Sequence, residues 1–193
     1  MLRVVSQHGV PETTTARIAE AAGVAEGTLY LHFENRTAML VAALDAILAQ
    51  MLELVQASTE EDPVERLKDI ARRHSDLMCT EQGGFAVPWL EFIAAGPQVG
   101  LREAVADIQT QAFEALRDIV EEGKATGGIR SDQDSDQLAW CWLSFAWAET
   151  MGCLMGLNEF LERRPSYQML EAVLDAAQPS GKDLSAPCDQ GPP

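Results

Sequence analysis

Several side chains within the first forty residues have the chemistry to hydrogen-bond to nucleic acid. Thr28, Tyr30 and His32 occupy alternate positions, and Arg36 follows one helical turn later. A threonine hydroxyl can contact a base or a phosphate, and its methyl group can contact thymine. If Arg36 begins a helix, free backbone N–H groups would attract phosphate together with its guanidinium. The alternatives are a core aromatic for Tyr30 and a surface or turn histidine for His32.

The surrounding segment, residues 13–36, has the pattern of two short helices joined by a tight turn. Ala19 is small where the helices would cross, and Gly23 can adopt the left-handed conformation that ends a helix. Leu29 supplies the apolar anchor of the second helix. This pattern predicts a helix-turn-helix unit, whose second helix would enter the major groove of DNA.

Short motifs follow one another across this unit and into the next helix. They are Gly23-Val24, Gly27-Thr28-Leu29-Tyr30, His32-Phe33, Asn35-Arg36 and Met39-Leu40. With them, residues 9–50 resemble the TetR family of one-component transcriptional regulators. The resemblance implies an all-α protein with an N-terminal three-helix domain joined by a long helix to a helical ligand-binding and dimerisation domain. The residues that it places at the DNA are Thr14, Thr15, Gly27, Thr28, Tyr30, His32 and Arg36.

The net charge of −16 does not favour electrostatic attraction to DNA. Residues 1–48 hold three arginines and five acidic side chains, so this part is less acidic than the rest without being basic. Glu26 stands where the family is often neutral or basic, and it could accept from cytosine or repel phosphate. The chain begins within an apolar helical pattern, whereas family members usually have a longer first helix and a basic tail. We therefore expect further residues upstream of Met1.

Helical periodicity continues through most of the chain, and no strand pattern is present. We predict a helix-turn-helix DNA-binding domain in residues 1–48, a helical ligand-binding and dimerisation domain in residues 49–177, and a disordered tail in residues 178–193. The predicted helices cover about residues 1–8, 13–22, 26–31, 35–55, 63–84, 85–95, 98–126, 136–157 and 165–177.

The resemblance also implies a small-molecule pocket in the second domain, which holds most of the aromatic residues. Aromatic and methionine walls suit an apolar or amphipathic ligand, although ordinary core or dimer packing is the alternative for each tryptophan. His74 is either a core histidine or a polar group of the pocket. Glu149 lies within an apolar helix, so it is either a counter-charge for a cationic ligand or the partner of an arginine of the same chain or of the dimer mate. The candidate ligand residues are His74, Trp89, Phe92, Trp140, Ser144, Trp147, Glu149 and Met151.

Small residues recur at every fourth position in the predicted helix 136–157. Such a row would let two helices approach closely, and TetR proteins dimerise through the corresponding helix together with the last one. The apolar face of residues 165–177 would complete the interface. The expected interface residues are Ala148, Gly152, Gly156, Tyr167, Leu170 and Leu174. A two-fold dimer implies a near-palindromic operator.

Other classes of protein have little support in the sequence. The cysteines form no CxxC pair, the His, Cys and acidic residues have no metal-ligand spacing, and no catalytic nucleophile–base pair is evident. Residues 138–157 are long enough to span a membrane, but Glu149 near their middle and the acidic flanks favour the centre of a helical bundle.

We therefore expect a cytoplasmic protein that is not an enzyme and needs no cofactor, metal or membrane. It would bind a double-stranded DNA operator as a homodimer and act as a repressor that a small-molecule effector releases. The alternative is a helical ligand-binding dimer with weak or lost DNA binding, which the acidic composition favours.

Overall fold

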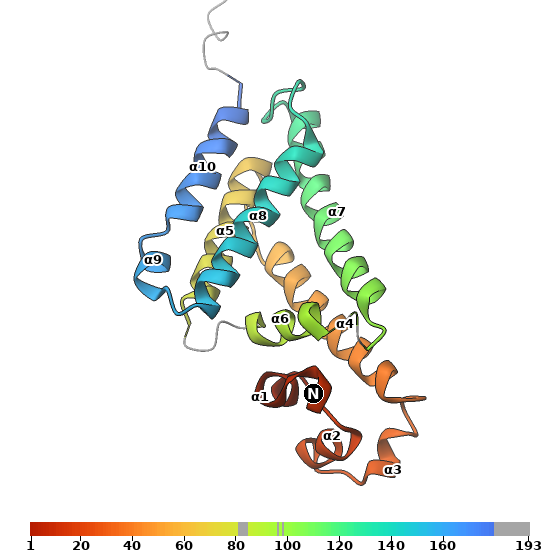
Figure 1. Cartoon of the computed structure of the whole chain (residues 1–193). Coiled ribbons are helices and arrows are strands. Elements are labelled where there is room, and N and C mark those ends of the chain that lie inside the picture. The colour runs from red at the N-terminus through yellow and green to blue at the C-terminus, as the bar shows by residue number, and fades with distance from the viewer. Residues whose placement is uncertain (81–84, 96, 98, 180–193) are drawn as a thin grey trace, which may run out of the picture.

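The computed structural model describes residues 1–80, 85–95, 97 and 99–179, and every regular element in these ranges is an α-helix. A small N-terminal bundle lies at one end of α4 and a larger bundle surrounds its other end (Figure 1). The helices are α1 (Leu2–Glu12), α2 (Thr15–Ala22), α3 (Glu26–Leu29), α4 (Arg36–Gln56), α5 (Pro63–Met78), α6 (Ala86–Ala95), α7 (Arg102–Thr126), α8 (Ser135–Leu154), α9 (Asn158–Glu162) and α10 (Pro165–Ala177). The predicted all-α fold is confirmed. Residues 180–193, most of the predicted disordered tail, lie outside the described residues.

Side-chain caps begin several of these helices at or beside the predicted residues. The Thr14 hydroxyl accepts from the Arg17 N–H at the start of α2, and Asn35 accepts from the Ala38 N–H at 2.9 Å to begin α4. The Asp62 carboxylate accepts from the Val64 and Glu65 N–H groups at the start of α5. Pro63 fits the first turn of this helix, where an N–H group would have no helical partner. Gly23 ends α2 with φ of +69°, in the left-handed conformation that its sequence position predicted.

Some predicted helix ends were wrong, and α9 was not predicted. The helix α3 ends at Leu29 rather than Leu31, because the Leu29 carbonyl accepts from His32 and Phe33 as the chain turns toward α4. The helix α8 ends at Leu154 rather than Leu157, because Gly156 adopts φ of +71°. The predicted end of the fifth helix at Gly83-Gly84 lies outside the described residues, and α5 itself ends at Met78.

Two apolar clusters and a smaller third one hold the helices together. The smallest joins Ile18, Ala19, Leu29 and Met39, so it packs the helix-turn-helix unit onto the first turn of α4. A second cluster joins α1, α4, α6 and the first half of α7, and includes Val10, Leu44 and Phe92. The largest lies between α5, α7, α8 and α10, where Ile70, Leu116, Trp142 and Leu174 are buried.

The connecting helix α4 is the one described helix that is long and apolar enough to cross a membrane. Its buried face contributes Met39 to the N-terminal cluster and Leu40, Leu44 and Ile47 to the second cluster. A core helix of a globular bundle meets the same criterion, and in α4 one face is buried against the apolar clusters. The helix thus joins the two parts of the chain through continuous apolar packing.

Candidate DNA-binding surface and ligand pocket

The short helix α3 presents polar side chains to solvent at the end of the molecule farthest from the larger bundle (Figure 1). Leu29 is buried, whereas Tyr30 is 52% exposed and His32 is also exposed. Tyr30 is therefore not a core aromatic. Leu31, which the sequence did not single out, is 80% exposed beside them. An exposed apolar side chain at this position could contact a thymine methyl group.

Polar side chains of this surface form hydrogen bonds within the helix-turn-helix unit. Thr14 caps α2, and the Thr15 hydroxyl donates to the Glu26 carboxylate at the start of α3. Glu26 is therefore engaged within the unit and helps to set the angle between α2 and α3. Gly27 and Thr28 follow on the same helix, and no side chain crowds Gly27 within 4 Å. The backbone at Gly27 is open to close approach.

The structure gives Arg36 a role that the sequence did not predict. Its guanidinium donates to the main-chain carbonyls of Thr13, at 2.7 Å, and of Val10. Arg36 therefore fastens the first turn of α4 to the end of α1, rather than extending freely toward a phosphate. Its contact with DNA stays a prediction.

The other two arginines of the N-terminal part are also occupied or distant from α3. Arg17 donates to the Glu12 carbonyl at 2.7 Å and pairs with its carboxylate at 3.3 Å. Arg3 lines a separate open hollow between α1 and the far half of α4, together with Glu53 and Arg73. Within residues 1–48, no arginine extends unpaired from the α3 surface, so this surface is polar rather than basic.

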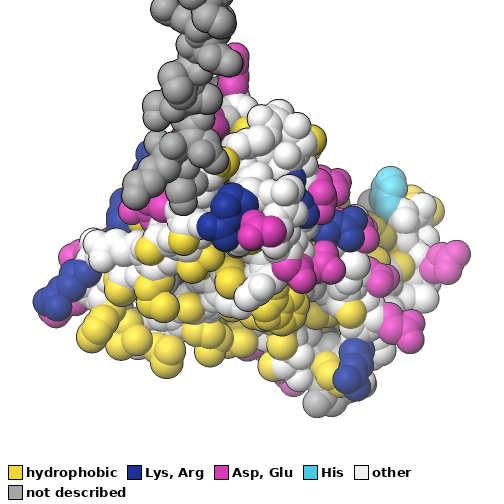
Figure 2. Space-filling model, turned by 90° about the horizontal axis from the view of Figure 1, so that it is seen from above, with side chains coloured by type: hydrophobic (Ala, Val, Ile, Leu, Met, Phe, Trp, Pro, Cys, Tyr) yellow, Lys and Arg dark blue, Asp and Glu magenta, His cyan; other side chains and the backbone are white. Residues whose placement is uncertain are grey.

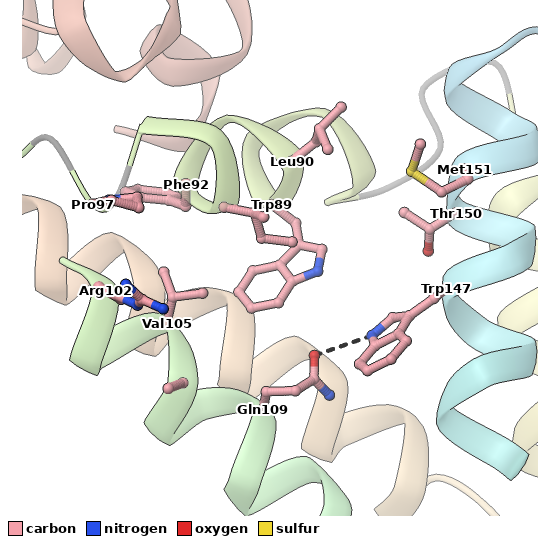
Figure 3. Close-up of a pocket in the computed structure, with 12 residues that line it drawn as sticks. Trp89, Leu90, Phe92, Pro97, Arg102, Val105, Gln109, Trp147, Thr150 and Met151 are labelled. Carbon is pink, nitrogen blue, oxygen red and sulfur yellow. Dashed lines mark hydrogen bonds between the residues drawn. The ribbon is translucent and has the colours of Figure 1, made fainter. Parts of the chain in front are cut away.

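An open cavity of about 530 Å³ lies between α6, α7 and α8. Its walls are mainly apolar and aromatic, with Trp89 and Phe92 from α6, Val105 from α7, and Trp147 and Met151 from α8 (Figure 3). Its polar groups are few: Gln109, Thr150 and Arg102. Four of the eight candidate ligand residues, Trp89, Phe92, Trp147 and Met151, line this cavity.

A hydrogen bond separates this cavity from a smaller inner one. The Trp147 Nε1–H donates to Gln109 Oε1 at 3.2 Å across the gap between α8 and α7 (Figure 3). The inner cavity measures about 60 Å³ and shares Trp89, Gln109, Trp147 and Thr150 with the open one.

His74 is buried in the core and also lines the inner cavity, and its role as a polar group of the ligand pocket stays a prediction. Its Nε2 lies 3.3 Å from the Ala146 carbonyl, and its ring meets Trp142 and Phe145 edge-on, with centroids 6.1 and 5.8 Å away. Burial lowers the pKa of His74 to about 4, so the ring is neutral at pH 7. A neutral imidazole suits an apolar ligand end.

The predicted pocket role of Glu149 requires correction. The side chain is 1% exposed but lines neither of these cavities, because it points to α5, where the Ser75 hydroxyl donates to Oε2 at 2.7 Å. Among the described residues, no arginine forms an ion pair with Glu149, because the nearby Arg164 pairs with Asp76. Pairing with an arginine of the dimer mate stays a prediction. Burial raises the pKa of Glu149, because the charged form loses solvation and its Oε1 has no hydrogen-bond donor.

Trp140 and Ser144 lie on the outer side of α8 and outside the lining of both cavities. Trp140 is 53% exposed and packs edge-on against Trp147 and Phe113, with ring centroids 5.1 and 6.4 Å away. Ser144 donates back to the Trp140 carbonyl at 2.8 Å. These two candidate ligand residues therefore lie on the exposed side of α8 and line neither cavity.

Several of the predicted interface residues point into the protomer instead of away from it. Gly152 is buried, and a Cβ atom there would lie 3.2 Å from the Leu161 side chain on α9. Gly156 lies past the end of α8, and Leu170 and Leu174 belong to the largest apolar cluster. Tyr167 is partly buried against the same cluster, whereas Ala148 is exposed. Of the row of small residues, only Gly152 is buried, whereas Ser144, Ala148 and Gly156 are exposed.

The exposed apolar residues of α8, α9 and α10 define a different surface, here called the α8–α10 face. Hydrophobic side chains gather on one side of the larger bundle (Figure 2). The members of the face are Trp140, Ala148, Met151, Met155, Phe160, Met169 and Val173. Exposed apolar patches are found at protein–protein contacts and at ligand-binding grooves.

The cavity wall α6 also packs against the N-terminal part of the chain. Figure 1 shows α6 lying between α1 and the larger bundle, and α1 and α6 are in extensive contact. The Glu91 carboxylate on α6 accepts from the Val10 N–H at 3.3 Å, beside the backbone break at Gly9. No motif in the sequence indicated a role for Glu91, because its partner Val10 lies 81 residues away along the chain.

Comparisons with known proteins agree with this arrangement. Residues 2–43 match the family model described as bacterial regulatory proteins, tetR family. The chain is 26% identical to the fatty acid metabolism regulator protein of Bacillus subtilis (strain 168) over 135 residues, 69% of each chain. It is 42% identical to the regulator TtgR of Pseudomonas putida over 65 residues, which cover only 31% of that protein.

Solved structures share the fold over nearly the whole chain. FadR from Bacillus halodurans has a TM-score of 0.71 at 21% identity, covering 88% of this chain and 90% of that one. FadR from Bacillus subtilis, solved in complex with stearoyl-CoA, has a TM-score of 0.68 at 21% identity, covering 91% and 92%. Residues 2–43 therefore carry the domain of bacterial regulatory proteins of the tetR family, and the chain as a whole shares the fold of these solved regulators.

Proposed function

We propose that the protein is a cytoplasmic repressor that binds a near-palindromic operator as a homodimer and is released by a small apolar or amphipathic ligand. The observation that carries this proposal is the position of α6, which forms one wall of the open cavity and also packs on α1. A ligand that favours one position of α6 would bias the position of the DNA-binding unit.

The dimer is supported by the α8–α10 face. This face is apolar and exposed in the part of the protomer that the structure describes, and two-fold pairing of α8 and α10 would cover it. Such a dimer presents two copies of α3, related by the same axis, to two half-sites of an operator. The expected DNA contacts are Thr28, Tyr30 and His32, with Gly27 allowing close approach of the backbone.

The nature of the ligand is supported by the cavity and by one relative. Aromatic and aliphatic side chains form most of the wall, which suits an alkyl chain. The similar FadR protein of Bacillus subtilis was solved with stearoyl-CoA, a thioester with a long alkyl chain.

A second candidate function, a ligand-binding dimer with little DNA affinity, is favoured by the occupied arginines. Arg17 pairs with Glu12 and Arg36 holds backbone carbonyls, so few cations are left for phosphate. Fluorescence anisotropy with DNA from upstream of the protein's own coding sequence separates the two functions. Saturable binding that weakens with salt supports the repressor, whereas binding no tighter than to unrelated DNA supports the alternative.

The release step has its own test in the same assay. Dodecanol and dodecanoate are added to the preformed complex of protein and DNA, and at least one should lower its anisotropy. Ala106→Trp places a large side chain at the cavity wall on α7, so this variant should keep DNA binding and lose the response. Ala106→Ser is the matched control. If the ligand releases DNA equally well from the Ala106→Trp and wild-type proteins, the open cavity is not the site at which the ligand acts.

A further inference from the structure

The open cavity has one charged side chain among the described residues that line it. Arg102 lies in the first turn of α7, at the end of the lining opposite Thr150 and Met151 (Figure 3). The rest of the lining is apolar or carries neutral polar groups. A molecule entering the cavity therefore meets apolar walls and a single cation at one end.

Arg102 differs from most basic side chains of this acidic protein because it has no carboxylate partner. Acidic residues outnumber basic ones by 30 to 14, and ion pairs hold most of the described lysines and arginines. These paired residues are Arg17, Arg66, Lys68, Arg72, Arg73, Arg117, Lys124, Arg130 and Arg164. In the part of the chain that the structure describes, no carboxylate lies within 4.0 Å of the Arg102 guanidinium. The guanidinium beside the cavity is available to an anion.

The wall also sets a direction for an alkyl chain. From Arg102 the cavity follows α7 past Val105 and Ala106 to Gln109, a rise of about 10 Å along the helix. Gln109 and Trp147 form the partition to the inner cavity, which continues along α7 to Ala112 and Leu116. Along α7 the lining therefore begins at the charged Arg102 and ends at the apolar Ala112 and Leu116.

We propose that the ligand of this cavity is an anionic amphiphile, with its carboxylate or phosphate on the Arg102 guanidinium and its alkyl chain between Trp89 and Trp147. This inference rests on the proposed function, because it assumes that the open cavity is the ligand site. The planar guanidinium can bind a carboxylate or phosphate with two parallel hydrogen bonds. Glu149 cannot select a cationic ligand here, because it lies outside the lining.

Matched probes with one alkyl chain and different head groups test the proposal. Isothermal titration calorimetry would compare dodecanoate, dodecanol, dodecyltrimethylammonium and lauroyl-CoA, each below its micelle concentration, on the full chain. Wild-type protein should bind the anions more tightly than the alcohol and the cation. Arg102→Gln should weaken anion binding about five- to tenfold and leave dodecanol binding unchanged. Arg102→Glu should reverse the preference between dodecanoate and dodecyltrimethylammonium.

Arg117→Gln is the control, because Arg117 is on the same helix, is outside both cavities, and makes one ion pair, with Asp118 at 3.9 Å. It should bind every probe as the wild type does. A larger loss of affinity for dodecanoate in Arg102→Gln would indicate a carboxylate head group, and a larger loss for lauroyl-CoA would indicate a phosphate-bearing one. Either result supports the proposal. Equal binding of dodecanoate and dodecanol to wild-type protein would overturn the head-group assignment while the cavity stands. If none of the four probes binds, both the assignment and the proposed ligand site fail.

Discussion

The Glu91 carboxylate on α6 accepts a hydrogen bond from the Val10 N–H on α1 at 3.3 Å. This bond joins α6, one wall of the open cavity, to the helix-turn-helix part of the chain. It lies at the break in α1, where Gly9 has φ of +73° and a Cβ atom would lie 2.8 Å from Glu91 Oε2. The close approach and the left-handed backbone both favour glycine at this position.

Glu91→Ala should weaken communication between the cavity and the DNA-binding unit. Loss of the acceptor leaves the Val10 N–H without its partner and loosens α6 from α1, so ligand-induced release of DNA should fall about fivefold, or ~1 kcal/mol of coupling. Ligand affinity, measured without DNA, should change little. Glu91→Gln keeps an oxygen acceptor and should retain most of the coupling. Full coupling in Glu91→Ala would show that the α1–α6 contact does not transmit the signal.

Arg36→Ala should mainly destabilise the N-terminal part of the chain. The substitution leaves the carbonyls of Val10 and Thr13 without their charged donor, which corresponds to roughly 2 kcal/mol. Thermal unfolding would show a lower midpoint, and Arg36→Lys should restore part of the loss. The opposite pattern, an unchanged midpoint with a shallower dependence of DNA binding on salt, would show that Arg36 contacts a phosphate.

Gly152→Leu and Ala148→Glu should have different effects although both lie on α8. Gly152 faces Leu161 within the protomer, so a larger side chain should lower stability by about 1–3 kcal/mol. Ala148 lies on the exposed α8–α10 face, so a carboxylate there should leave the fold intact and dissociate the dimer. Chemical denaturation and sedimentation velocity would separate these outcomes. If Ala148→Glu remains a dimer, the interface is not the α8–α10 face.

Stability should fall as the pH is lowered from about 6.5 to about 4 because of His74. Its pKa in the folded state, about 4, is below its ordinary value of 6.5, so the unfolded chain takes up a proton first. The stability associated with the neutral ring is complete above pH 6.5 and is lost on acidification, with a limit of about 3 kcal/mol. Glu149, whose pKa is raised by burial, acts in the opposite sense. The difference between the wild type and His74→Gln in denaturation at several pH values isolates the histidine, and parallel curves would contradict the assignment.

The sequence by itself determined the helix-turn-helix unit. Thr14, Gly23 and Asn35 act on backbone groups within a few residues, so their effects can be read along the chain. The spacing of apolar residues every three or four positions likewise located most helices of the larger bundle, because burial of one helix face imposes this period. The family motifs lie in the same local segment.

Only the tertiary structure decided what several polar and small residues contact. Arg36 meets Val10, Glu149 meets Ser75, and Gly152 meets Leu161. Each partner lies on another element, so its position depends on how the helices pack and not on local spacing. The cavity, Arg102 at its end and the Glu91 bond to α1 arise in the same way, because α6, α7 and α8 enclose a space that no single helix encodes.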